Sequence, residues 1–455
     1  MAIQQSIYQD LIDKIWPQLN LYVNEKINGS KRELTYLHKQ RLTPVYSPDQ
    51  KWEGTSANTR FVAADMVAMD SPLPLKKRST ISSANGHLPK IGMSKKMTET
   101  DINNLNIMRA QMEAMPDNSN GRKQKYDQML RRVADDGNAC AVGIDERNEY
   151  NYLYGISNGI VLVEVLDDNG NNGVGMRVNY GYPASNTFAT SVKGDICGDD
   201  IDNVIERADA KGVTIQTAMI SKTLLNKIRK SRWARELAAD YKELVYTDAS
   251  KLAVPTQKTF LEAFENEYNF SFIVVDRSVL TEKNGKDYPV KPFNPNRIIF
   301  LPNASNDGSL VWGTLAEATA PADGVTYSTV DEYKLISRFR TNEPSLMEIT
   351  KGQAIVLPVI EDVESIFVLD LEAGLEVDNS DSTESGESDA NITINGKVYN
   401  KAKVITGLKE MGIDIRTNAK DSMVIRKINE LSKEDYEAFE AKLPGYVNTE
   451  SSGKG

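Results

Sequence analysis

Residues 72–97 of this 455-residue chain read PLPLKKRSTISSANGHLPKIGMSKKM. The stretch contains no Asp or Glu, although the whole chain has a formal net charge of −10. Its basic residues are Lys76, Lys77, Arg78, Lys90, Lys95 and Lys96. Proline and glycine recur in it, and its apolar residues show no helical period, so it buries too little apolar surface to offset its own ordering entropy. We therefore expect either a disordered segment or an extended hairpin that lies on another surface.

The overall composition is that of a soluble globular protein. Hydrophobic residues make up 40% of the chain and charged residues 26%, and the length allows two or three domains. No apolar run reaches the roughly 18 residues of a membrane span, and the first residues lack the basic-then-apolar order of a signal peptide. A pI near 5.1 argues against wholesale coating of nucleic acid. We expect a cytoplasmic protein in which Cys140 and Cys197 stay reduced.

The sequence offers little for catalysis. Its only histidines, His38 and His87, lie in segments that read as an exposed arm and a hairpin. No nucleophile elbow, Walker loop, dinucleotide fingerprint or paired-cysteine zinc motif is present. The neighbouring carboxylates at 135–136 and 199–200 have simpler interpretations, as a solvated helix face and a helix N-cap. We expect no enzyme activity, no catalytic or metal site and no cofactor.

Residues 1–60 read as an N-terminal arm. Three-four spacing of apolar residues predicts an amphipathic helix that Pro17 limits or kinks; the residues are Ile7, Leu11, Ile12, Ile15, Trp16 and Leu19. The remainder of the arm, with Pro44 and Pro48, reads as extended chain. The helix could pack on its own core or dock on a neighbouring molecule, and the sequence favours neither.

Two helices are expected after the basic stretch. TETD at 98–101 is a capping-box start. After a break at 116–121, a second helix is predicted over 122–149, roughly 40 Å long at 1.5 Å per residue. Its outer face is predicted to be charged and solvated, through Arg131, Arg132, Asp135, Asp136, Asp145, Glu146 and Arg147.

Strands and helices alternate in the second half of the chain. Strands are expected at 159–166 and 174–178. The pattern from residue 198 predicts a helix capped by Asp199 or Asp200, a short strand at 213–216 and a helix from Ser221 to Leu237. A helix at 259–268 and strands at 270–276 and 297–302 follow, and together they indicate a compact α/β domain with a mixed sheet. Two buried strands are predicted at 352–360 and 365–371.

The C-terminal part begins with a linker. Residues 378–389 are rich in serine and acidic residues and contain no Lys, Arg or aromatic residue. A hairpin turn is predicted at Asn395 and Gly396. Helices are expected at 401–411 and 422–431, and the tail is disordered by composition.

The basic stretch allows three interpretations: a solvated loop, an arm that binds nucleic acid, or a strap on an acidic neighbouring subunit. Basic clusters bind phosphate groups. The stretch has no aromatic residue on which a base could stack, which weakens a single-strand role. Exposed ion pairs contribute only about 0–1 kcal/mol each, so a strap would set register and association rate more than affinity.

The order of these parts resembles the major capsid proteins of tailed bacteriophages, with the Hong Kong-97-type shell fold and a likeness to lambda-type major head proteins. The segment NPNRIIFLP at 294–302, followed by 308–313, looks like a late axial-domain strand and turn of that family. EPSLMEITKGQAIVLP at 343–358 looks like the segment that returns to the peripheral sheet. The likeness covers roughly residues 40–372 and is one of architecture.

This resemblance implies an α+β capsid fold with an arm, an extended hairpin loop, a long spine helix, a peripheral sheet and an axial α/β domain. The implied boundaries are 1–60 for the arm, 61–98 for the extended loop, 99–197 for the spine helix and peripheral domain, 198–348 for the axial domain and 349–377 for the return. An acidic linker (378–390), an additional small α/β module (391–445) and a disordered tail (446–455) complete the chain.

The function implied is that of a structural subunit. Copies would form hexamers and pentamers that close into the icosahedral head around a double-stranded DNA genome, without sequence-specific DNA binding or membrane contact. Lys76, Lys77, Arg78, Lys90, Lys95 and Lys96 would contact a neighbouring subunit. Portal, scaffolding, decoration or auxiliary capsid proteins are further partners, and the protein would be made in the host cytoplasm and reside in the virion. The alternatives are a nanocompartment shell of the same fold and a DNA-binding protein that uses the C-terminal module.

Overall fold

The computed structural model describes residues 3–21, 23, 36–56, 82–163, 176–191, 196–243, 252–283, 286–372, 391–394, 397–400, 404, 405 and 408. The chain divides into two compact units, Met1–Glu376 and Val377–Gly455. Each is described by itself.

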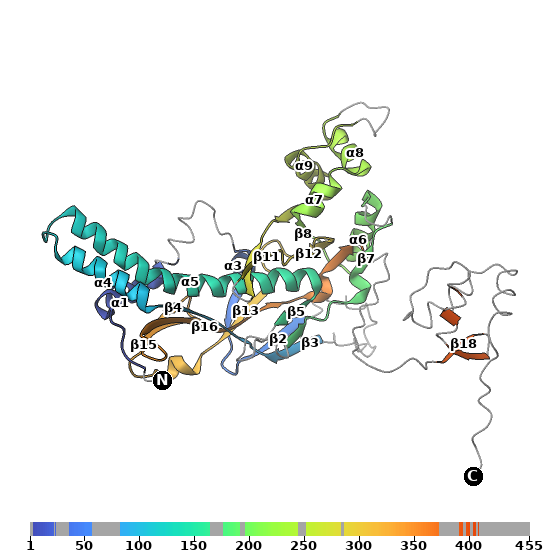
Figure 1. Cartoon of the computed structure of the whole chain (residues 1–455). Helices are drawn as coiled ribbons and strands as arrows, with labels where there is room; N and C mark the ends of the chain where they lie inside the picture. Colours follow the sequence, from blue (N-terminus) through green and yellow to red (C-terminus); the bar gives the residue numbers. More distant parts are fainter. Residues whose placement is uncertain are drawn as a thin grey trace, which may run out of the picture. The chain divides into compact units, whose positions relative to one another are not determined.

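Two helices joined by a short turn dominate the first unit (Figure 1). Helix α4 (Glu99–Glu113) begins with the predicted capping box, in which Thr98 and Asp101 each bond the other's backbone. Helix α5 (Asn120–Asn158) is longer than the predicted 122–149, because its buried stripe continues through Tyr152 and Ile156. Its 39 residues span roughly 58 Å. Gly159 ends it with a positive φ of 71°, which favours glycine.

A six-stranded sheet lies along α5. Strand β16 (Met347–Ile360) pairs with three strands: β4 (Lys90–Met97), β13 (Gly308–Gly313) and β15 (Lys334–Thr341). Strands β1 (Leu42–Tyr46) and β14 (Thr326–Val330) pair with β13 and β15. Helix α5 packs along β16, and a side chain at Gly352 would come within 2.7 Å of Cβ of Cys140. The glycine therefore allows the helix to lie close to the strand.

The N-terminal segment packs on its own chain. Helix α1 (Gln9–Ile15) continues into the 3-10 turn η1 (Trp16–Gln18), where Pro17 stands as predicted. Its apolar side chains join α4, α5 and the sheet in one core. Of the two interpretations open for this helix, the described contacts favour its own core.

The segment expected as one extended loop, 61–98, is divided between two elements. Strand β2 (Lys51–Ser56) pairs with β3 (Ser82–His87) as an antiparallel hairpin that begins before residue 61. Strand β4 leaves this hairpin and joins the large sheet. Residues 57–81 lie outside the described part.

A second, mixed sheet has the strand order β7-β17-β12-β8-β9. Its strands are β7 (Thr187–Ala189), β8 (Thr217–Ser221), β9 (Ser271–Val275), β12 (Arg297–Leu301) and β17 (Phe367–Asp370). The strand predicted at 213–216 is therefore wrong: this segment is the approach to β8. Strand β17 pairs with β12 and β7 in this second sheet.

Four helices accompany this sheet: α6 (Gly198–Ala210), α7 (Lys222–Ile228), α8 (Arg232–Tyr241) and α9 (Gln257–Tyr268). Cys197, not Asp199 or Asp200, is the N-cap of α6, and Asp200 bonds back to the Cys197 backbone from the third helical position. The single helix expected from Ser221 to Leu237 is two, because Ser231 caps a new helix.

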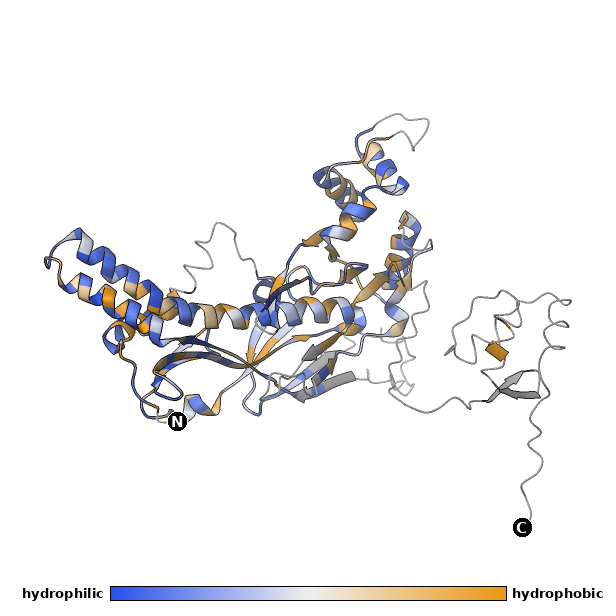
Figure 2. Ribbon diagram, viewed as in Figure 1, coloured by the Kyte–Doolittle hydropathy of each residue, from blue (hydrophilic) through white to orange (hydrophobic). Residues whose placement is uncertain are grey.

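Smaller elements complete the first unit. They are α3 (Leu37–Arg41), β5 (Ile160–Val163) with β6 (Met176–Asn179), η2 (Ala184–Asn186), β10 (Val279–Lys283) with β11 (Lys286–Val290), α10 (Ala316–Thr319) and η4 (Val363–Ser365). Figure 2 shows most of α4 and the adjoining part of α5 as hydrophilic, whereas apolar residues concentrate on the strands.

The second unit contains an antiparallel hairpin. Strands β18 (Asn391–Ile394) and β19 (Lys397–Asn400) flank the predicted turn at 395–396, which itself lies outside the described residues. Val404, Ile405 and Leu408 are helical and buried, within the helix predicted at 401–411. The helix predicted at 422–431, the linker and the tail lie outside the described residues.

Candidate functional site

The structure separates the six basic residues that the sequence grouped together. Lys76, Lys77 and Arg78 lie outside the described residues. Lys90, Lys95 and Lys96 are exposed on β4, which pairs with β16 of the same chain. These lysines are therefore part of the large sheet and not of a separate loop.

The lysines of β4 point to both faces of the sheet. Met97 is buried, and Met93 occupies the space over Gly143 of α5 where a side chain at that position would stand. Alternation along a strand places Lys95 on this same face. Burial raises the pKa of Asp136 on α5, and the positive charges of Arg338 and Lys95 oppose this rise. Lys90 and Lys96 lie on the opposite face.

The three lysines of β4 differ from the buried charged residues of the large sheet. In the described part of the chain, none of Lys90, Lys95 and Lys96 takes part in an ion pair. Lys351 of β16, opposite Ser94 of β4, lies over the ring of Phe339 with its Nζ 4.8 Å from the ring centroid. The exposed cations on this sheet are thus available to a partner.

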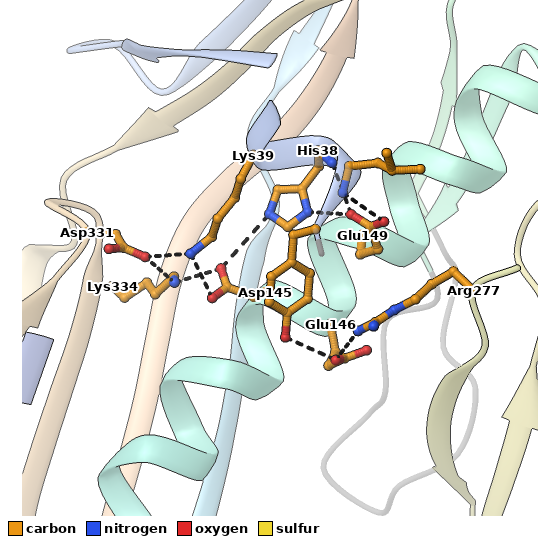
Figure 3. Close-up of polar contacts among 10 residues, drawn as sticks. His38, Lys39, Asp145, Glu146, Glu149, Arg277, Asp331 and Lys334 are labelled. Carbon is orange, nitrogen blue, oxygen red and sulfur yellow. Dashed lines mark hydrogen bonds and ion pairs between the residues drawn. The ribbon is translucent and has the colours of Figure 1, made fainter. Parts of the chain in front are cut away.

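A second charged cluster is buried where α3 crosses α5 (Figure 3). Glu149 accepts hydrogen bonds from the backbone N–H groups of Leu37 and His38, at 3.1 and 3.0 Å. Its carboxylate also lies 2.7 Å from Nδ1 of His38. One carboxylate therefore fixes the first turn of α3 onto the long helix.

Asp145 lies one helical turn before Glu149 and is the centre of the cluster. Its carboxylate oxygens lie 2.6 Å from Nζ of Lys334, 3.1 Å from Nζ of Lys39 and 3.9 Å from Nε2 of His38. The side chains of His38, Asp145 and Lys334 are 0% exposed. Since a buried ion is costly without a partner, each member depends on the others.

Asp331 closes the cluster from the turn between β14 and β15. It binds Lys39 at 2.9 Å and Lys334 at 2.7 Å. Burial alone would raise the pKa of Asp331, but the two ammonium groups outweigh it and hold the pKa at about 2. The cluster thus joins three parts of the chain: α3, α5 and the β14–β15 turn.

Glu146 extends the cluster toward the second sheet. It accepts a hydrogen bond from the hydroxyl of Tyr36 at 3.0 Å and pairs with Arg277, which follows β9. Burial and the negative charge of Glu146 raise the pKa of Tyr36. These contacts connect the start of α3 to the segment between β9 and β10.

The cluster fixes the fold and is not arranged for catalysis. The side chains of His38, Asp145 and Lys334 are inaccessible to solvent, and no serine or cysteine bonds to His38 in the described residues. The prediction that His38 lies in an exposed arm is wrong, as is the solvated face assigned to Asp145, because α3 and the β14–β15 turn cover them. The sequence did carry a signal for the burial of these carboxylates, because Asp145 and Glu149 lie close in the helix to the apolar residues Ile144 and Tyr152.

A buried carboxylate also fixes the N-terminal segment. Glu348 of β16 pairs with Arg338 of β15 at 3.0 Å and accepts hydrogen bonds from Ser6 and from the backbone of Ile7, at 2.6 and 2.7 Å. Arg338 also donates to the backbone carbonyl of Val133 in α5. The N-terminal segment, the sheet and the long helix therefore meet at one ion pair.

Among the described residues, no three or more His, Cys, Asp and Glu side chains gather in a way that would hold a metal ion. No described helix is both long and apolar enough to cross a membrane.

A comparison with known proteins identifies a family whose model matches the chain. The model of the family described as phage major capsid protein E matches residues 40–367, which include α4, α5 and nearly all strands of both sheets. No curated protein sequence matches the chain.

Solved structures similar to the chain include a protein described as a prophage capsid protein of Escherichia coli CFT073. It has 10% sequence identity and a TM-score of 0.46, over 77% of this chain and 98% of that one. The cyanophage A-1(L) capsid is similar at 13% identity and a TM-score of 0.37, over 73% of this chain and 90% of that one. The procapsid of satellite phage P4 is similar at 10% identity and a TM-score of 0.37, over 81% and 92%.

Proposed function

The chain belongs to the phage major capsid protein E family, and from this premise we propose that it assembles as hexamers and pentamers into an icosahedral head that encloses double-stranded DNA. It is a structural major capsid protein, and its place is the virion. The observation that carries the proposal is the family match over residues 40–367, which takes in α4, α5 and nearly all of both sheets. A nanocompartment shell and a DNA-binding protein are not favoured, because the matching family is one of phage capsids.

The exposed basic residues are the proposed contact with a neighbouring subunit. Lys90, Lys95 and Lys96 form no ion pair with the residues that the structure describes, and the subunit as a whole is acidic, with a formal net charge of −10. A neighbouring copy therefore offers acidic surface to these lysines and to Lys76, Lys77 and Arg78. Such exposed pairs set register and association rate more than affinity.

The same net charge bears on the packaged genome. An acidic wall repels DNA phosphates, which would keep the enclosed DNA from adhering to the shell. Portal, scaffolding and decoration or auxiliary capsid proteins are proposed partners, and synthesis is proposed in the bacterial host cytoplasm. The family implies a structural role without enzyme activity.

Electron microscopy and sedimentation of the purified chain test the assembly. We expect closed shells, tubes or capsomer rings, and a chain that stays monomeric at every concentration would contradict the proposal. Reversing the charge of Lys76, Lys77 and Arg78 to Glu should lower particle yield while the melting temperature of the subunit stays unchanged. Replacing the same three residues by Gln gives a matched control, for which we expect a smaller loss of particle yield. Normal particle yield from the charge-reversed variant would exclude this contact.

A further inference from the structure

The β10–β11 hairpin is a two-stranded sheet that pairs with no other strand in the described part of the chain. Val279 at its base is buried, but Leu280 is 67% exposed and Tyr288 is 49% exposed. An isolated hairpin of two strands is marginally stable in water. Two large exposed apolar side chains on such a hairpin call for a surface that covers them.

The strand register places like charges opposite one another. Glu282 pairs with Asp287, and at the next position Lys283 pairs with Lys286. Directly opposite residues of an antiparallel pair share one face, with Cβ atoms roughly 5 Å apart, and like charges there are destabilising. Glu282 and Asp287 therefore repel each other near the tip of the hairpin.

Alternation along the strands sorts these residues onto two opposite faces. Leu280, Glu282, Asp287 and Pro289 share one face, because 280 pairs with 289 and 282 with 287. Thr281, Lys286 and Tyr288 share the other. One face is thus acidic around an exposed leucine, and the other is basic around an exposed tyrosine.

Among the described residues, no ion pair compensates the charges at the tip of the hairpin. Glu282, Asp287 and Lys286 are exposed, and none of them has an ion pair or hydrogen bond from its side chain among the described residues. The exposed ion pairs nearest in sequence use Asp276 with Lys222 and Lys291, at the base of the hairpin and not at its tip. The tip of the hairpin thus carries exposed charges that pair with none of the described residues.

We propose that the hairpin is a two-faced contact between copies of this chain, in which the Leu280–Glu282–Asp287 face of one copy docks on the Lys286–Tyr288 face of the next. The two faces of a single hairpin complement each other in charge and in their apolar centre, so no second kind of partner is required. A contact between two different faces is head-to-tail, and such contacts close into rings when the rotation allows. This inference rests on the proposed function, since it assigns a contact within the assembled rings.

Charge reversal on each face, followed by a full exchange, tests the proposal in the full-length chain. One variant carries Glu282→Lys and Asp287→Lys, the second carries Lys283→Glu and Lys286→Glu, and the third carries all four substitutions. Each of the first two has two faces of the same sign, and we expect its assembled fraction in sedimentation to fall at least about tenfold. The third variant restores complementary faces and should regain most of the assembly.

Two controls separate this contact from general effects. Glu262→Lys with Glu265→Lys reverses two exposed carboxylates of α9 and should leave assembly near the wild-type level, while circular dichroism confirms that every variant folds. Assembly of either two-substitution variant at the wild-type level would overturn the contact. A four-substitution variant no better than the others would also overturn it, because the faces would then meet a different surface. A wild-type chain that never assembles would overturn the proposed function together with this contact.

Discussion

The cluster around Asp145 and the β10–β11 hairpin use the same kinds of residues in opposite ways. In the cluster, two lysines and a histidine surround buried carboxylates from three parts of one chain. On the hairpin, the carboxylates of Glu282 and Asp287 lie opposite each other, and both are exposed to solvent. Charges that are paired in the buried cluster hold the fold, and we propose that the exposed charges of the hairpin serve contacts between copies.

Removing the ammonium group from the cluster should have the largest effect. Lys334→Met leaves the carboxylate of Asp145 buried with fewer cations, and we expect the free energy of unfolding to fall by about 3 kcal/mol. Urea denaturation measures this loss. Lys291→Met is the matched control, because Lys291 is exposed and its pair with Asp276 should contribute less than about 1 kcal/mol. Equal losses in the two variants would remove the distinction between balanced and unbalanced charges.

Acid should weaken the cluster in a defined pH range. The pKa of Asp331 is about 2 in the folded chain and near its usual value of 3.8 when unfolded. A lowered pKa contributes stability that is fully present above pH 4 and is lost as the pH falls toward 2. The contribution at neutral pH is about 2 kcal/mol, and it should disappear from the pH profile of Asp331→Asn. A wild-type profile parallel to that of the variant between pH 4 and 2 would contradict this assignment.

The smallest effect is expected at an exposed helical pair. Lys258 and Glu262 lie 3.7 Å apart on α9, and the lysine side chain is 85% exposed. Lys258→Gln should change the free energy of unfolding by less than about 0.5 kcal/mol, and salt should reduce even this difference. A thermal melt at low and at high ionic strength checks it. A change as large as that of Lys334→Met would mean that burial does not determine how much an ion pair contributes to the free energy of unfolding.

Local sequence patterns predicted the structural features that depend on residues close together in the sequence. The capping box of Thr98 and Asp101, the long helix with its apolar stripe and the limit that Pro17 sets to the first helix are all present. The α+β capsid fold and the capsid family are confirmed by the family match. The order of helices and strands along the chain was enough to suggest the capsid family. It did not show which residues contact one another.

Contacts between distant parts of the chain were not predictable in the same way. Asp145 reads as solvated because its partners, Lys39 and Lys334, lie far from it in the sequence. The helix was predicted to end nine residues too early, although Gly159, which follows Asn158 with a positive φ, is a local stop signal. The β10–β11 hairpin did carry a signal, since Asn284 and Gly285 form a turn dipeptide between two short strand-like runs.

The pairing of β16 has a consequence for how the chain is synthesised. This one strand, near the C-terminal end of the first unit, is the shared partner of β4, β13 and β15. A ribosome releases β4 long before β16, so the edge of β4 that β16 will occupy stays open during most of translation. Pairing over such sequence separations is slow and leaves strand edges available to other nascent chains. Stalled or truncated chains that end before residue 347 should therefore aggregate, and chaperones that cover open strand edges should matter most in that interval.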